Sequence, residues 1–150
     1  MGGTDTPVAS AGVHASLAQH TAILLSRLGV LAQKRVAAEL ESIDLSPRLW
    51  GALNVLDSEG EITQHALGAC TGADPSTVVA TVDELEARGL VERRRHPSDR
   101  RAHALHVTAA GRATLSQGRK LAGAAQAELL APLSSTEREQ LQALLLKLVS

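Results

Sequence analysis

The stretch DPSTVVATVDELEARGLVERRRHPSDRRAHALHVT, from Asp74 to Thr108, decides the fold. It opens with Asp-Pro, a typical helix start, because an N-cap Asp accepts hydrogen bonds from first-turn amides and Pro loses no donor that the helix needs. Three apolar residues then recur at helix spacing and predict one buried stripe: Val78, Val82 and Leu85. Arg88 falls in the last turn, where a cation interacts favourably with the helix dipole, and Gly89 follows it as a residue that can adopt positive φ. The sequence therefore predicts a helix over 74–88.

The other face of this helix is expected to point away from the stripe, and it holds small, hydroxyl and acidic residues: Ser76, Thr77, Ala80, Thr81 and Glu84. Short hydroxyl side chains near a helix start let a backbone approach the DNA major groove closely, although they would suit any exposed helix equally well. The acids at 83, 84 and 86 are interpreted as solvated charge.

A basic hairpin is predicted after the helix. Two short apolar runs, at 90–91 and 104–107, flank an arginine-rich segment with Pro-Ser-Asp turn chemistry at its tip. The fourteen residues 88–101 hold six arginines and two acids, in a chain whose formal net charge is −1. Such a concentration of positive charge favours a phosphodiester partner, the alternative being an ordinary solvated face. Asp99 could orient Arg101, and an arginine at the tip could enter a minor groove.

The remaining chain is predicted to be helical, over about 14–41, 47–59, 63–70, 109–131 and 135–149. Glu61 and Ile62 could form a brief third strand. In the 63–70 helix, Cys70 is expected to face inward as core packing, with oxidant sensing as the alternative. This helix and the 74–88 helix, joined by a glycine-containing turn, form a helix-turn-helix.

These motifs together resemble the MarR family of winged helix-turn-helix transcription regulators. The most family-specific element is Asp99-x-Arg101, followed by a hydrophobic strand and Thr108-x-x-Gly111. The resemblance implies a mainly α fold with a small β-hairpin wing. It implies a DNA-binding lobe over 45–108 and helical dimerisation segments over 13–42 and 109–150. The Gly, Thr, Pro and Ser content of residues 1–12 separately predicts a disordered tail.

The resemblance also implies a set of DNA-contacting residues in the helix-turn-helix and the wing: Thr63, Gln64, Ser76, Thr77, Val79, Ala80, Thr81, Arg94, Arg95, Asp99, Arg100 and Arg101. This chain has Ala80 and Glu84 where basic residues are common in the family, so we expect more of the affinity to come from the wing and from phosphate contacts.

The expected function is a sequence-preferring, ligand-responsive repressor that binds double-stranded DNA as a homodimer on a pseudo-palindromic operator. The last helix is strongly apolar, which favours burial against a second copy over a monomer. The alternative is a winged-helix interaction module whose basic wing binds an acidic protein. In the family the effector is a small, often phenolic, molecule held between the helical region and the DNA-binding lobe. Three residues are candidates for that crevice, although ordinary surface or core roles suit them too: His20, Arg27 and Trp50.

Composition and residue spacing argue against several other classes of function. Hydrophobic residues make up 44% of the 150, but Trp50 is the only aromatic one, so recognition of single strands by base stacking is disfavoured. No apolar run is long enough to span a membrane, and a single cysteine excludes an intramolecular disulfide, so a cytoplasmic location is expected. No zinc-ligand spacing, cofactor motif or catalytic motif is present, so we expect no metal, no cofactor and no enzymatic activity.

Overall fold

The computed structural model describes residues 13–95 and 103–150. The expected tail over 1–12 lies outside the described residues, and so do three candidate wing residues: Asp99, Arg100 and Arg101.

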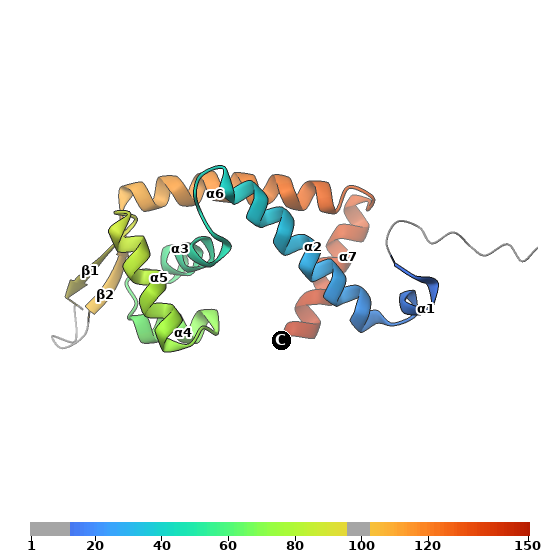
Figure 1. Cartoon of the computed structure of the whole chain (residues 1–150), viewed down its shortest axis with the longest axis horizontal. Helices are drawn as coiled ribbons and strands as arrows, with labels where there is room; N and C mark the ends of the chain where they lie inside the picture. The colour runs from blue at the N-terminus through green and yellow to red at the C-terminus, as the bar shows by residue number, and fades with distance from the viewer. Residues whose placement is uncertain (1–12, 96–102) are drawn as a thin grey trace, which may run out of the picture.

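The described chain is mainly helical with one two-stranded antiparallel hairpin, which confirms the expected fold class (Figure 1). The elements in order are α1 (Ala15–Ala18), α2 (Thr21–Glu41), α3 (Pro47–Glu59), α4 (Gln64–Thr71), α5 (Pro75–Ala87), β1 (Val91–Arg95), β2 (His103–Val107), α6 (Ala109–Leu129) and α7 (Ser135–Val149). In the hairpin Val91 lies opposite Val107, and Arg95 lies opposite His103.

Four helices start at the capping residues that the sequence predicts, and Thr108 is a further cap that was not predicted. A side-chain oxygen accepts a hydrogen bond from a first-turn amide at the start of α3 to α7, and the capping residues are Ser46, Thr63, Asp74, Thr108 and Ser134. At α7 the Glu137 carboxylate also accepts from the Ser134 amide, which completes the expected capping box.

The N-terminal helix and the segment at residues 61–62 differ from the sequence-based expectation. The continuous helix expected from His14 to Glu41 is wrong, because the backbone at His20 is extended and separates α1 from α2. Since α1 contributes no buried residue, no core contact keeps it in line with α2. The brief third strand is present as a single bridge, in which the Leu105 amide donates to the Ile62 carbonyl at 2.8 Å.

The core is aliphatic and lies in the lobe formed by α3, α4, α5 and the hairpin, with α6 crossing it (Figure 1). Its largest fully buried side chains are Leu40, Leu45, Leu49, Leu53, Leu56, Leu67, Val82, Leu85, Val91, Leu105 and Leu115. At the opposite end, α2 and α7 carry exposed apolar side chains, and α7 buries no residue of its own.

The base of the hairpin is fixed to α6 by a close contact. The Thr108 hydroxyl donates to the Gly89 carbonyl at 2.7 Å and accepts from the Gly111 amide at 3.0 Å, while the Thr108 amide donates to the Leu90 carbonyl at 3.0 Å. A Cβ atom on Gly111 would lie 2.1 Å from that same carbonyl oxygen. Only glycine allows α6 to approach the end of α5 this closely.

Candidate nucleic-acid interface

The exposed start of α5 is organised around Asp74. One carboxylate oxygen accepts from the Thr77 amide at 3.0 Å and from the Ser76 hydroxyl at 2.5 Å, and the other accepts from the Thr77 hydroxyl at 2.6 Å. These side-chain hydrogen bonds from Ser76 and Thr77, with the backbone bond from Thr77, hold the pKa of Asp74 well below its usual range. Because both hydroxyl protons are directed at the carboxylate, the hydroxyl lone pairs remain for a partner that donates hydrogen bonds.

Further along α5, the expected groove-facing residues do not all share one face. Val79 is 45% exposed and Ala80 is exposed. The expectation that Thr81 points away from the core is wrong, since Thr81 is only 4% exposed. Its hydroxyl donates to the Thr77 carbonyl at 2.6 Å and accepts from Arg48 Nη1 at 2.6 Å. Thr81 therefore belongs to the buried face of α5 and connects this helix to α3 through Arg48.

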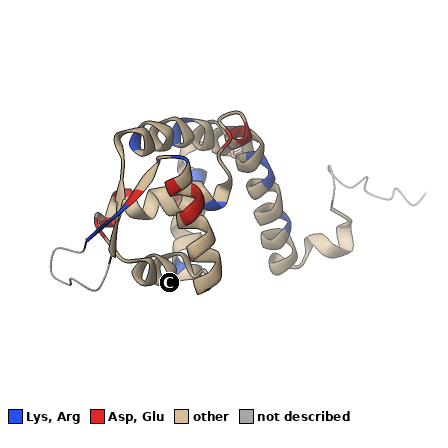
Figure 2. Cartoon of the chain, turned by 60° about the vertical axis from the view of Figure 1, so that its left-hand side comes forward, with Lys and Arg blue, Asp and Glu red and all other residues tan. Residues whose placement is uncertain are grey.

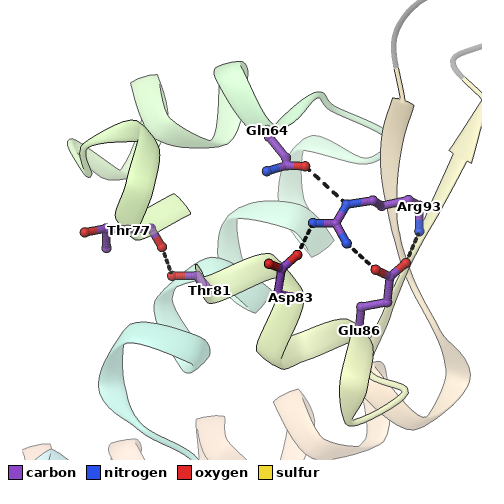
Figure 3. A network of polar contacts seen from close by, with 6 residues as sticks. All are labelled: Gln64, Thr77, Thr81, Asp83, Glu86 and Arg93. Atoms are coloured by element: carbon purple, nitrogen blue, oxygen red, sulfur yellow. Dashed lines mark hydrogen bonds and ion pairs between the residues drawn. The ribbon is translucent and has the colours of Figure 1, made fainter. Parts of the chain in front are cut away.

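Arg93 of β1 connects three elements of the lobe (Figure 3). Its Nε donates to Gln64 Oε1 of α4 at 3.2 Å, and its Nη2 lies 2.5 Å from Asp83 of α5. Its Nη1 pairs with Glu86 of α5, whose other oxygen accepts from the Arg93 amide at 3.2 Å. Arg93 belongs to the basic run, but its guanidinium is directed into the protein, where it fixes the hairpin against α4 and α5.

The acids of α5 are partly exposed to solvent, as expected, but each is also paired with an arginine, which the sequence-based interpretation did not include. Asp83 and Glu86 pair with Arg93, and Glu84 lies 2.6 Å from Arg48 of α3. The negative charge on this helix is thus balanced by arginines of α3 and β1. It repels a phosphate backbone less than the sequence alone suggests.

Two arginines of the outer end of β1 are exposed, and in Figure 2 this end leads into residues 96–102. Arg94 is 51% exposed at its side chain and pairs with Glu92 and, at 3.9 Å, with Glu61. Arg95 is exposed beside it. Both expected wing residues that the structure describes therefore lie at the solvent face of the hairpin.

Thr63 and Gln64 lie at the start of α4. Thr63 caps the helix by accepting from the Ala66 amide at 3.2 Å, and both side chains are half-buried. Gln64 already accepts from Arg93 through its carbonyl oxygen. Its amide nitrogen remains the group with which it could donate to a partner.

The residues nominated for an effector crevice are not brought together. His20 is exposed at the start of α2, at the end remote from α3 (Figure 1), and Arg27 is exposed two turns later. Trp50 of α3 packs against Gly118 of α6, where an added Cβ would lie 2.8 Å from Trp50 Cδ1. Its indole Nε1 is buried and has no hydrogen-bond partner among the described residues.

Cys70 is exposed, so its expected inward orientation is wrong. Within residues 13–95 and 103–150, no group of three metal-ligating side chains comes together. No helix in these ranges has the length and apolar composition to cross a membrane.

Arg48 is the residue that sequence reasoning missed. It joins α3 to α5 across 33 and 36 positions, so no local pattern reveals its partners. One weak signal in the sequence could have indicated that Arg48 has a partner. A cation in the first turn of a helix opposes the helix dipole, which suggests an acidic partner elsewhere in the fold.

Comparison with known proteins identifies this lobe. Residues 43–102 match the model of the MarR family. Over 137 residues the chain is 31% identical to a protein of Thauera aromatica described as a transcriptional regulatory protein for the hcr operon, with 91% of this chain and 82% of that protein covered. The chain belongs to the MarR family. It is accordingly a DNA-binding transcription regulator.

Solved structures of the MarR-family repressor CouR have the same fold. CouR of Rhodococcus jostii RHA1 bound to p-coumaroyl-CoA is 32% identical, with a TM-score of 0.77 over 88% of this chain and 93% of that one. CouR bound to a 23-mer DNA duplex is 29% identical, with a TM-score of 0.84 over 94% of this chain and 100% of that one.

Proposed function

We propose that the protein is a non-enzymatic, cytoplasmic repressor that binds a pseudo-palindromic DNA duplex as a homodimer and is released by a small aromatic ligand. The observation that carries the proposal is the exposed start of α5, with its hydroxyls and apolar side chains, beside a hairpin with arginines at its outer end. The similarity to a repressor solved on a DNA duplex supports this use of the two features, and it disfavours an acidic protein partner.

In this proposal α5 enters the major groove. The Ser76 and Thr77 hydroxyls accept hydrogen bonds from base amino groups, such as adenine N6 or cytosine N4, because their protons are directed at Asp74. Val79 and Ala80 contact thymine methyl groups. Thr63 and Gln64 approach the backbone from the start of α4.

The wing supplies the electrostatic part of binding. Arg94, Arg95 and Arg100 would contact phosphates, and Arg101, which Asp99 would orient, would enter the adjacent minor groove. This assignment follows the family resemblance at the tip and the exposed position of Arg95 in β1. Arg93 is excluded from the contact set because its donors are engaged within the lobe.

A homodimer would cover the apolar surfaces at the end of the molecule opposite the hairpin. The most exposed apolar residues of α7 are Leu144, Leu146, Leu148 and Val149, from 59% to 82% exposed. Two of them, Leu146 and Val149, line a hollow of about 730 Å³ between α2, α6 and α7. A surface of this kind supports pairing with a second copy, and two-fold pairing would present two α5 helices to one face of a duplex.

The proposed effector is a phenolic acid or its coenzyme A thioester. CouR was solved with p-coumaroyl-CoA, which is a thioester of this class. In this chain the buried, unpartnered Trp50 Nε1 lies between α3 and α6, where it could donate to a polar ligand atom. The ligand would release DNA only if it binds the released conformation more tightly than the DNA-bound one.

Selection from a randomised duplex pool tests the proposal. The full-length protein should enrich an approximately palindromic site, and p-coumaroyl-CoA or a related phenolic thioester should release that site from the wild type more readily than from Trp50→Phe. Absence of duplex binding even at low salt, where the phosphate contribution is strongest, would overturn the DNA-binding function. Release that is unchanged in Trp50→Phe would remove only the ligand assignment.

A further inference from the structure

Arg48 makes the only described side-chain hydrogen bonds that run from α3 to α5. It occupies the first turn of α3, directly after Pro47, and its side chain is 42% exposed. One terminal nitrogen, Nη1, donates to the Thr81 hydroxyl at 2.6 Å, and the other, Nη2, donates to Glu84 Oε2 at 2.6 Å. The guanidinium therefore spans two consecutive turns of the helix that would read DNA.

The contact extends toward the proposed DNA-reading end of α5. The Thr81 hydroxyl donates a hydrogen bond to the Thr77 carbonyl at 2.6 Å (Figure 3). The Thr77 hydroxyl in turn donates a hydrogen bond to the capping carboxylate of Asp74. A hydrogen-bonded series thus runs from the first turn of α3 to the first turn of α5, through a side chain that is almost fully buried.

We infer that Arg48 is a positioning residue that sets the specificity of DNA recognition by fixing the rotation of α5 on α3. The inference rests on the proposed use of α5 in the major groove. Two hydrogen bonds on successive turns resist rotation of α5 about its axis, and a small rotation would redirect Ser76, Thr77 and Val79 away from their bases. The planar fork of arginine is required, because a lysine ammonium cannot hold both acceptors in this geometry.

The competing role is a direct phosphate contact, and the two roles differ in their effect on variants. A phosphate contact tolerates lysine, affects all duplex sequences alike and contributes to the salt dependence. Glu84→Gln also separates the roles. It removes a negative charge and leaves Arg48 a neutral amide oxygen in place of a carboxylate, so a phosphate contact would gain affinity for every duplex, whereas a positioning contact would lose specificity.

The experiment compares four variants with the wild type: Arg48→Ala, Arg48→Lys, Thr81→Val and Glu84→Gln. Each binds, at several salt concentrations, the duplex that the wild type selects from a randomised pool and a shuffled duplex of the same composition. Thermal melting of each variant checks that it is folded. The two conservative replacements, Arg48→Lys and Thr81→Val, keep the test valid if Arg48→Ala folds poorly.

We expect Arg48→Ala and Arg48→Lys to lower affinity for the selected duplex by about tenfold, the effect of one charge-assisted hydrogen bond, and to change affinity for the shuffled duplex by less than about twofold. The salt slope should be unchanged. Thr81→Val and Glu84→Gln should also lower the ratio of the affinity for the selected duplex to the affinity for the shuffled duplex. The inference is overturned if Arg48→Lys binds like the wild type, or if both duplexes weaken together with a shallower slope. Failure of the wild type to bind any duplex would instead reject the proposed function.

Discussion

The contact between Gly111 and the Leu90 carbonyl predicts a large loss of stability for Gly111→Ala. The added Cβ would lie 2.1 Å from the Leu90 oxygen, 2.8 Å from Val107 Cγ1 and 3.0 Å from the Leu90 carbonyl carbon. Ordinary heavy-atom contacts lie near 3.5 Å, so α6 or the 89–90 backbone must move by more than about 1 Å. That movement would also disturb the hydrogen bond from the Thr108 amide to the same oxygen.

Overpacking of this kind costs about 3 kcal/mol, the upper end of the usual range, because the obstructing atom is backbone and cannot change rotamer. For a chain of this size we expect the melting temperature to fall by roughly 10 °C. The melting temperature is measured by circular dichroism. All variants are compared at one protein concentration, because dimerisation would make the melting temperature depend on concentration.

Gly51→Ala is the matched control. Gly51 also lies inside a helix, but its added Cβ meets nothing within 4 Å. Alanine should therefore raise stability there by about 0.5–1 kcal/mol through its better helix propensity. If Gly111→Ala melts within about 2 °C of the wild type, the close approach of α6 to the end of α5 is not a packing constraint, and this explanation of the Thr108-x-x-Gly111 motif is wrong.

Two further predictions concern the lobe. Arg93→Ala removes hydrogen bonds to Gln64, Asp83 and Glu86, and should lower the free energy of unfolding by about 1–3 kcal/mol in chemical denaturation, without making the salt slope of DNA binding shallower. A shallower slope would show that Arg93 contacts phosphate instead. Asp74→Asn should melt below the wild type at neutral pH. Because the pKa of Asp74 is lowered in the folded protein, its stabilisation is present above the unfolded pKa, and the difference in melting temperature should shrink only as the pH falls below about 4. A difference that does not depend on pH would contradict the lowered pKa.

Local signals account for what the sequence could predict. Caps at Ser46, Thr63, Asp74 and Ser134 are formed by residues within three positions, so reading the chain in order reveals them. The same applies to the hairpin, whose two strands are adjacent in the sequence.

The contacts and orientations that the sequence failed to predict have two physical sources. The first is long-range charge pairing, because Arg48 reaches its partners across 33 and 36 positions and Arg93 reaches Gln64 across 29. The second is the weight given to residue type over position. Thr81 lies three residues after Val78 and four before Leu85, which is the buried face by helical spacing, yet its hydroxyl favoured an exposed placement. Cys70 lies near the end of an eight-residue helix, where so short a pattern fixes the face poorly.

The central claim is that a slightly acidic chain binds DNA mainly through the arginines of its wing. The measurement is the affinity of the full-length protein for its selected duplex at several salt concentrations. With Arg48 and Arg93 engaged inside the lobe, roughly three wing arginines per subunit remain for phosphates, and the dimer should give a slope of log affinity against log salt near −5. A slope shallower than about −2 would contradict the claim, since it would leave the wing arginines mostly in solvent.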